Sequence, residues 1–170
     1  MVEPKFIYNV KVLLSKKSKR ELEFSQVIRQ KSFVSEYHKA LLNLWFTSNH
    51  IRDRQEKIFK RYNIKSQHYN VLRIVNGQHP NPATPGYILE VMIDKGRDLT
   101  RLVDKLVKMG LLTRCTHEQN RRMVSITITE KGITMVEEIK FKLDRMLADS
   151  QNLTDHECAQ LSNLLDKLRG

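Results

Sequence analysis

The chain has 170 residues and a mass of 20.0 kDa, which favours one domain with a core large enough to need no disulfide or metal. Hydrophobic residues make up 40% and charged residues 29%, which excludes both a chain disordered by composition and a membrane protein. Against 19 Asp and Glu residues stand 30 Lys and Arg residues, a net charge of +11. This excess of positive charge is typical of a protein that binds nucleic acid. The alternative is that the surplus lysine residues serve only to keep the protein soluble.

The sequence carries no signal for secretion, membrane insertion or metal binding. The start of the chain lacks a basic stretch leading into an apolar core, and the longest apolar-rich run, 40–51, is shorter than the ~20 residues of a membrane helix. Cys115 and Cys158 lie far apart without metal-ligand spacing, and no two histidines stand four residues apart. We therefore expect a cytoplasmic protein with reduced thiols, no membrane partner, no metal and no other cofactor.

The first part of the chain predicts an arm and a long helix. Alternating apolar residues over 6–14 predict a strand, a basic stretch follows at 16–20, and a helix begins near Leu22. We interpret 1–33 as an N-terminal arm that packs on this chain or on a partner. Apolar residues then recur at helical spacing over 34–61, a length unusual for one compact unit.

Two short helices are predicted next, on either side of a loop rich in helix breakers. Ser66 as N-cap begins a helix to about Val75 that Gly77 ends. After the loop at 79–86, Thr84 as cap and Pro85 in the first turn begin a helix that ends near Met92.

The helix predicted over 97–109, which Gly110 ends, is amphipathic. Its apolar face is formed by Leu99, Leu102, Val103 and Leu106, and its opposite face by a cationic row of Arg97, Arg101, Lys105 and Lys108. Asp98 caps this helix or accepts a hydrogen bond from a cytosine amino group. A short helix, a tight turn and a cationic helix are the order of a helix-turn-helix, whose second helix fits the DNA major groove. An ordinary amphipathic surface helix is the alternative.

Two strands predicted at 112–116 and 123–129 form a hairpin with a polar tip at 117–122. Folding does not require the adjacent exposed arginines Arg121 and Arg122 at such a tip. A narrow minor groove attracts arginines presented in this way. The cationic helix and the basic hairpin together predict a winged helix-turn-helix.

The C-terminal part predicts two further helices. Thr129 caps the first, and a capping box from Thr154 to Glu157 opens the last. The helices at 34–61 and after Thr154 carry apolar stripes that a compact winged helix does not need, so we expect them to form a dimer; completing a monomer core is the alternative. The predicted fold is mainly α with a small β-hairpin wing, in four parts: the arm 1–33, a dimerisation helix 34–61, a winged helix-turn-helix 62–132 and C-terminal dimerisation helices 133–170.

Three segments in order resemble the MarR family of bacterial transcriptional regulators. They are the run from Thr100 to Leu112, the wing residues Asn120-Arg-Arg, and Ile128-Thr-Glu-Lys-Gly132. The resemblance covers about 34–169. It implies a homodimer whose first and last helices pair across a two-fold axis, with two wings gripping a pseudo-palindromic operator.

The resemblance also assigns residues to DNA binding. Thr100 and Arg101 match the family's base-reading pair and Arg122 its wing arginine, whereas Asn120 stands where the family usually has Asp, which weakens the support of the wing arginine. The full set expected to contact DNA is Ser66, Gln67, Lys95, Arg97, Asp98, Thr100, Arg101, Lys105, Asn120, Arg121 and Arg122.

The function predicted is that of a sequence-specific, non-enzymatic transcriptional regulator, with repression favoured. Double-stranded DNA and a second copy are its expected partners. Many relatives are released from DNA by small aromatic compounds, for which the candidate residues here are Trp45, His50, His68, Tyr69 and Arg73; core packing or solvent exposure is the alternative for each. The alternative function is a nonspecific architectural DNA-binding protein, in which net charge alone drives binding.

Overall fold

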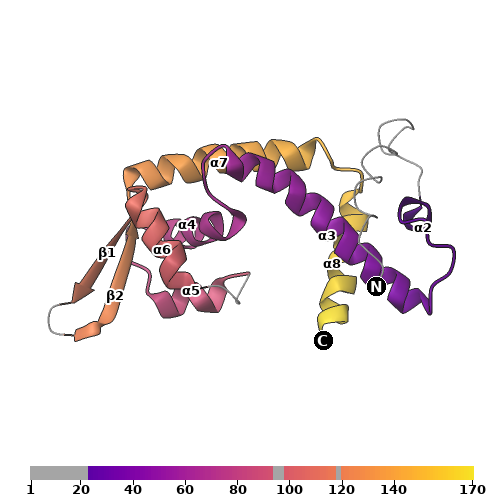
Figure 1. The fold of residues 1–170 in the computed structure, drawn as a ribbon, viewed down its shortest axis with the longest axis horizontal. Coiled ribbons are helices and arrows are strands. Elements are labelled where there is room, and N and C mark those ends of the chain that lie inside the picture. The colour runs from indigo at the N-terminus through magenta and orange to yellow at the C-terminus, as the bar shows by residue number, and fades with distance from the viewer. Residues whose placement is uncertain (1–22, 94–97, 118–119) are drawn as a thin grey trace, which may run out of the picture. The chain divides into compact units, whose positions relative to one another are not determined.

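The computed structural model describes residues 23–93, 98–117 and 120–170, and the chain divides into two compact units, Met1–Arg52 and Asp53–Gly170. The described elements are mainly helical, with one two-stranded antiparallel sheet (Figure 1). This confirms the predicted class of a helical chain with a hairpin wing. The strand predicted at 6–14 and the basic stretch after it lie outside the described residues.

The first unit contains the short helix α2 (Phe24–Val27) and the beginning of α3 (Glu36–Lys60), the long helix predicted at 34–61. Three aromatic rings join them. The ring of Phe24 stacks on Phe33 at 6.0 Å between centroids and lies 5.9 Å from Phe46 of α3. The segment before α3 therefore packs on α3 of the same chain.

The second unit begins with the last turns of α3 and continues with α4 (Ser66–Gln78), α5 (Pro85–Val91) and α6 (Leu99–Lys108). The apolar face of each helix points into one core, as the periodicity predicts. Its fully buried side chains come from α4 to α6, the hairpin and the helix that follows it, and include Val71, Leu72, Ile88, Leu106, Leu111, Leu112, Ile126 and Ile139.

The ends of α4 and α5 test the predicted helix signals. The α5 prediction is confirmed, since the Thr84 hydroxyl accepts a hydrogen bond from the Tyr87 N–H at 3.2 Å and Pro85 occupies the first turn. The α4 boundaries were predicted wrongly. Ser66 is the first helical residue, after Lys65 at the N-cap, and its N–H donates to Oε1 of Glu56 at 3.2 Å. Gly77 lies inside the helix, which continues to Gln78.

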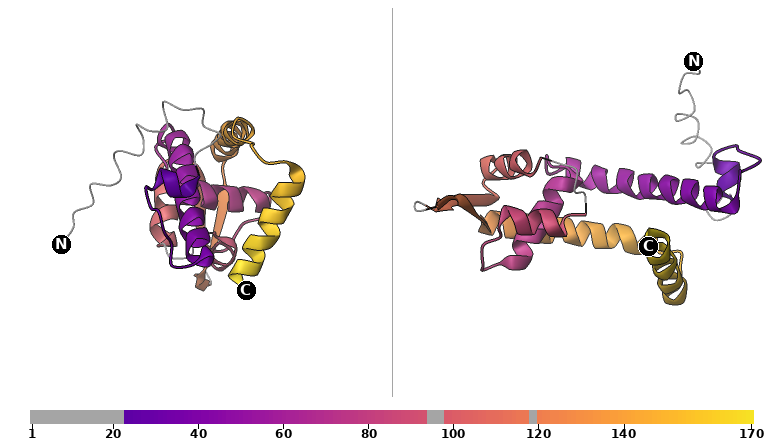
Figure 2. Two further views of the ribbon diagram at one scale, coloured as in Figure 1. Left: turned by 90° about the vertical axis from the view of Figure 1, so that its right-hand side faces the viewer. Right: turned by 90° about the horizontal axis from the view of Figure 1, so that it is seen from below.

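The hairpin pairs β1 (Leu112–His117) with β2 (Asn120–Ile128). It projects from the second unit beyond α6, away from α4 and α5 (Figures 1 and 2). The register runs from Leu112↔Ile128 to Thr116↔Val124 and then shifts, so that His117 pairs with Asn120. The strands are longer than predicted, and the polar segment 117–122 is mostly strand rather than loop.

Two capped helices, α7 (Glu130–Ala148) and α8 (Asp155–Arg169), complete the second unit. Both predicted caps are confirmed, since the Thr129 hydroxyl accepts from the Gly132 N–H at 3.1 Å and that of Thr154 from the Glu157 N–H at 3.3 Å. Glu157 returns the bond by accepting from the Thr154 N–H at 2.8 Å. Among the residues described, no helix has the length and apolar character to cross a membrane.

Candidate nucleic-acid interface

Helix α6 is fixed to the core along one face and carries cations on the other. Leu99, Val103 and Leu106 are buried, whereas the Arg101 side chain is 88% exposed. Thr100 and Lys108 are exposed beside it. This arrangement holds the backbone of the helix in place and leaves long cationic side chains available to an external ligand.

Lys105 departs from the predicted cationic row. Its Nζ donates to the backbone carbonyl of Asn63 at 2.8 Å, so the half-buried side chain leans toward the end of α3. Arg97, the first member of the row, lies outside the described residues, as does Lys95. Among the described residues of the row, the outward cations are Arg101 and Lys108.

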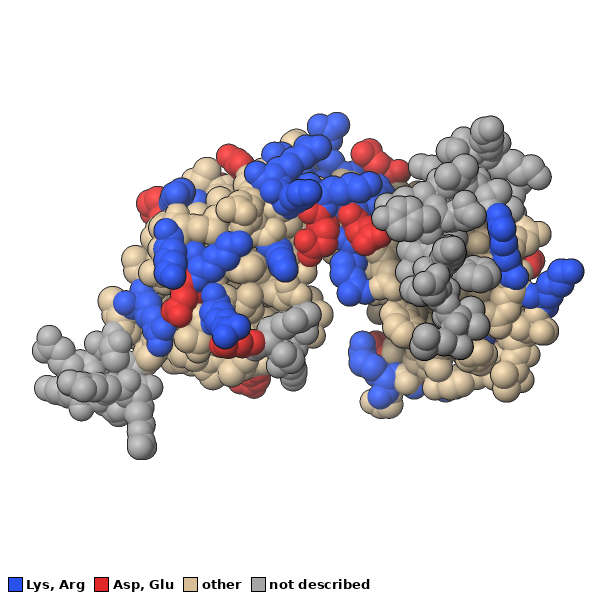
Figure 3. Space-filling view, viewed as in Figure 1, with Lys and Arg blue, Asp and Glu red and all other residues tan. Residues whose placement is uncertain are grey.

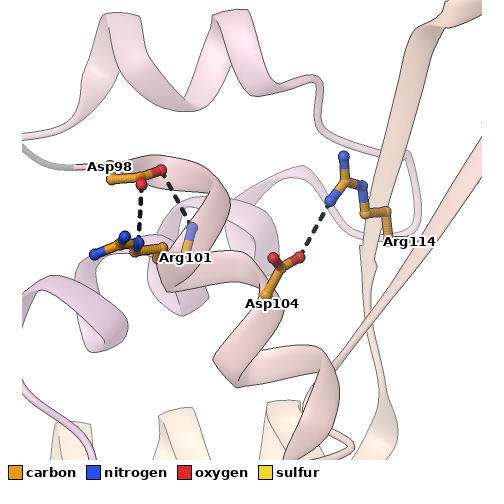
Figure 4. A network of polar contacts seen from close by, with 4 residues as sticks. All are labelled: Asp98, Arg101, Asp104 and Arg114. Atoms are coloured by element: carbon orange, nitrogen blue, oxygen red, sulfur yellow. Dashed lines mark hydrogen bonds and ion pairs between the residues drawn. The ribbon is translucent and has the colours of Figure 1, made fainter.

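Two carboxylates of α6 orient two arginines (Figure 4). Asp98 caps the helix, because its Oδ1 accepts from the Arg101 N–H at 3.3 Å, while its Oδ2 lies 3.3 Å from Nε of Arg101. Asp104 pairs through Oδ1 with Nη1 of Arg114 on β1 at 3.1 Å. The first contact holds Arg101 near the start of the helix, and the second ties the wing to α6.

The joint between α6 and α7 satisfies the carbonyl groups that end α6. Gly110 takes a left-handed conformation with φ of +70°, which stops the helix as predicted. Lys131 then donates through Nζ to the Met109 carbonyl at 2.8 Å, and the Thr129 hydroxyl donates to the Gly110 carbonyl, also at 2.8 Å. These bonds fix the end of α6 against the wing and α7.

The remaining wing residues lie on β2. Asn120 is the first residue of the strand, and Arg121 and Arg122 follow it, between the pairs His117↔Asn120 and Thr116↔Val124. They therefore belong to the irregular end of the ladder rather than to the loop at its tip. Their side chains are outside what the structure describes.

The start of α4 brings a buried histidine close to two lysines. Nδ1 of His68 accepts a hydrogen bond from the Lys65 N–H at 3.1 Å, and its side chain is only 7% exposed. Burial lowers the pKa of His68, and the ammonium groups of Lys105 and Lys65 lower it further against the opposing charge of Glu56. Ser66 and Gln67 stand in the same first turn of α4. This turn therefore lies in a positive field next to α6.

The charges drawn in Figure 3 agree with the placement of cations on and next to α6. Over the second unit, Lys and Arg side chains gather in the region of α6, with single acidic groups between them. Such a distribution attracts a polyanion and offers several separate contacts to its phosphates.

Comparisons with known proteins agree with this geometry. No family model matches the chain. Among curated proteins, it is 25% identical over 119 residues to the HTH-type transcriptional regulator PapX of Escherichia coli, covering 69% of this chain and 73% of PapX. A crystal structure of a MarR transcription factor from Planctomyces limnophilus matches 78% of this chain and 99% of that one, with 28% identity and a TM-score of 0.57.

A mutant MarR from Escherichia coli, crystallised in complex with operator DNA, matches 81% of this chain and 99% of that one. Its identity is 26% and its TM-score 0.63. The match thus spans almost the whole of a MarR protein. Over most of its length, the chain is similar to transcription regulators of the MarR family. The resemblance stated from Thr100–Leu112, the wing and Gly132 is confirmed.

The five effector candidates do not form one group within either unit. Trp45 and His50 are exposed on the part of α3 in the first unit. His68, Tyr69 and Arg73 lie on α4 in the second unit, where His68 is buried and Arg73 exposed. The Tyr69 ring packs on Phe59 at 5.3 Å between centroids, and its burial raises the pKa of its hydroxyl. Tyr69 is thus mainly a packing residue.

Sequence reasoning missed three contacts that position α6: Asp104–Arg114, Lys105–Asn63 and Lys131–Met109. Each joins residues on different elements, and only the opposite charges of Asp104 and Arg114 gave a hint in the sequence. Within the described ranges, no group of three or more His, Cys, Asp or Glu residues is placed to hold a metal ion.

Proposed function

We propose that this MarR-family regulator is a homodimer that binds a pseudo-palindromic DNA site through α6 and the wing, and represses transcription by covering that site. The observation that carries the proposal is α6 itself, with its buried apolar face and its exposed Arg101. The operator complex of the Escherichia coli protein, which has the same fold, supports the DNA partner.

Unpartnered apolar side chains support the homodimer. In the first unit, Val34 is 92% and Trp45 67% exposed. In the second unit, α8 has no buried residue, and Leu164 is 64% exposed. On each surface the apolar side chains recur at helical spacing, and a second protein surface is needed to bury them away from water. A two-fold dimer supplies one, and it sets two reading helices about 34–36 Å apart, one turn of DNA.

The DNA contacts divide into three roles. Arg101 reads a base, because an exposed guanidinium near the start of α6 can bond O6 and N7 of a guanine, and Thr100 is exposed beside it. Lys108 and the start of α4 contact phosphates. Arg121 and Arg122 enter the minor groove, with Asn120 replacing the carboxylate that would hold the wing arginine.

A small aromatic effector that releases the DNA completes the proposal. The organohalide-sensing regulator RdhR, which shares this fold with 20% identity and a TM-score of 0.68, was crystallised with 2,4-dichlorophenol. Of the five candidates, His68 and Arg73 offer polar groups on α4, while Trp45 and His50 are on α3. The protein acts in the cytoplasm, on DNA, without catalysing a reaction.

Selection of genomic fragments bound by the purified protein tests the proposed function. We expect an inverted-repeat site that unrelated DNA displaces only at about 10³-fold or greater excess, at fixed salt. Equal binding to selected and unrelated fragments would support the architectural protein instead.

A further inference from the structure

A cleft of about 400 Å³ opens between the end of α3, the turn to α4 and the side of α6. It lies wholly within the second unit. Its lining residues are charged or polar except for Ile64, and are Asp53, Glu56, Lys57, Lys60, Asn63, Ile64, Lys65 and Lys105. Of this set, only Lys105 is among the residues that the sequence assigned to DNA contact.

The cleft carries more cations than anions. Asp53 and Lys60 are two turns apart on α3, or about 10 Å, so Asp53 lies at the end of the cleft nearer the middle of that helix. Glu56 reaches the start of α4, where its Oε1 accepts a hydrogen bond from the Ser66 N–H at 3.2 Å. Lys57 and Lys60 also come from α3, Lys65 lies in the turn, and Lys105 comes from α6. The end of the cleft next to α6 therefore holds Lys60, Lys65 and Lys105 around the one carboxylate of Glu56, and it is cationic on balance.

The bond from Lys105 to Asn63 joins this end to α6. One proton of the ammonium group is used by the Asn63 carbonyl at 2.8 Å, which leaves two donors for a ligand. The exposed Lys65 is the N-cap of the 13-residue helix α4, whose Ser66 N–H is already bonded to Glu56. Four ammonium groups against two carboxylates on one concave surface favour an anion.

We infer that the cationic end of this cleft, formed by Lys57, Lys60, Lys65 and Lys105, binds the phosphate backbone of DNA beside the segment that α6 reads. This inference rests on the proposed function and extends it to a second, sequence-independent contact region. Two features favour backbone phosphate over a small free anion. The cleft is continuous with α6 through Lys105, and Asp53 at its far end opposes an anion that would fill the whole cavity.

The salt dependence of DNA binding tests the inference. The intact protein, Lys60→Gln, Lys65→Gln and the double variant are titrated with a selected duplex and with an unrelated duplex over a series of KCl concentrations. Each phosphate contact contributes about 0.9 to the slope of log K against log salt. We expect each single change to reduce the slope by about that amount and the double change by about twice it, equally on both duplexes, whereas Lys65→Arg keeps the original slope.

Lys140→Gln is the matched control, because Lys140 is exposed on α7, does not line the cleft and loses the same charge. Unchanged slopes in the cleft variants, or a loss as large in Lys140→Gln, would overturn the inference. Inorganic phosphate, added at constant ionic strength, identifies a free-anion site. If it displaces DNA from the intact protein but not from the double variant, while their slopes agree, the cleft holds a free anion and the inference is wrong. Failure of the proposed function is separate, since it appears as equal affinity of the intact protein for both duplexes.

Discussion

Gly132 shows how a single residue fixes the geometry of the DNA-binding unit. It lies in the first turn of α7, and a Cβ built there would collide with the carbonyl oxygen of Leu111 and the side chain of Ile128. Neither neighbour is free to move, since the Thr129 N–H donates to the same Leu111 carbonyl at 3.1 Å and Ile128 is buried in the core. The close approach of α7 to the end of α6 therefore requires glycine.

Gly132→Ala is expected to destabilise the protein by about 1–3 kcal/mol, since overpacking outweighs the better helix propensity of alanine. Gly77→Ala is the control, because Gly77 lies inside α4 with open space around its Cα, and alanine should stabilise the fold by about 0.5–1 kcal/mol. Urea unfolding measures both. A Gly132→Ala variant as stable as the original would show that α7 and the Leu111 loop separate easily.

His68 makes stability depend on pH. Burial first, and the ammonium groups of Lys105 and Lys65 second, lower its pKa in the folded state. In the unfolded chain it takes up a proton near pH 6.5. Proton uptake by His68 therefore favours the unfolded state. The free energy of unfolding is not reduced by His68 above about pH 6.5, and it declines as the pH falls below that value.

We expect the melting temperature to fall between about pH 7 and pH 5, and His68→Gln, which retains an acceptor for the Lys65 N–H, to reduce the fall. His156→Gln serves as control, since His156 is exposed in the first turn of α8. The same fall in the original protein and in both variants would rule out His68 as its source.

At the scale of elements, α6 combines a backbone held by several contacts with exposed cationic side chains. Asp98, Lys131 and the Asp104–Arg114 pair hold the helix at its start, its end and its side. The Asp98–Arg101 pair is exposed, and such pairs contribute at most about 1 kcal/mol to stability. Arg101 can therefore exchange Asp98 for a base at a cost to the fold of at most about 1 kcal/mol.

Arg101→Ala should weaken binding to a selected duplex by about 1–3 kcal/mol and relax preference at one base position. Its melting temperature should change little, because the side chain is exposed. Fluorescence anisotropy on duplexes with single-base changes measures the effect, with Lys108→Ala as a comparison that affects all duplexes alike. Equal losses of Arg101→Ala on every duplex would make Arg101 a phosphate contact rather than a base contact.

Most elements were predictable from the sequence because apolar periodicity and caps are local signals. Thr84, Thr129 and Thr154 all cap the helices that they were predicted to cap. The prediction that Gly77 ends α4 was wrong. A glycine inside a helix and a glycine that ends one differ in backbone conformation, which the sequence does not record. The strand position of Arg121 and the lean of Lys105 toward Asn63 depend on pairing and chain reversal, which spacing along the chain does not contain.

At the scale of the whole molecule, the proposed homodimer would both cover the exposed apolar surfaces and place two DNA-binding units on one site. A single winged unit contacts too few phosphates and bases to bind one site specifically. A two-fold pair doubles the number of both kinds of contact. In the second unit, Leu161, Leu164 and Leu168 of α8 are exposed together. We therefore expect dimer formation and operator binding to be lost together.

Leu164→Glu should yield a monomer of 20.0 kDa in sedimentation and abolish binding to a selected duplex, with the circular dichroism spectrum of the helices retained. Asn163→Glu adds the same charge on another side of α8 and should remain dimeric. A Leu164→Glu protein that stays dimeric would place the interface elsewhere.

The spacing of the two half-sites tests the central claim most directly. Starting from a selected inverted repeat, base pairs are inserted at its centre one by one, and the affinity and the number of chains per duplex are measured for each. A dimer with two fixed α6 helices predicts two chains per original duplex, and a loss of specific binding once about five inserted base pairs turn one half-site to the opposite side of the duplex. Affinity that stays unchanged across the series, or one chain per duplex, would contradict the account.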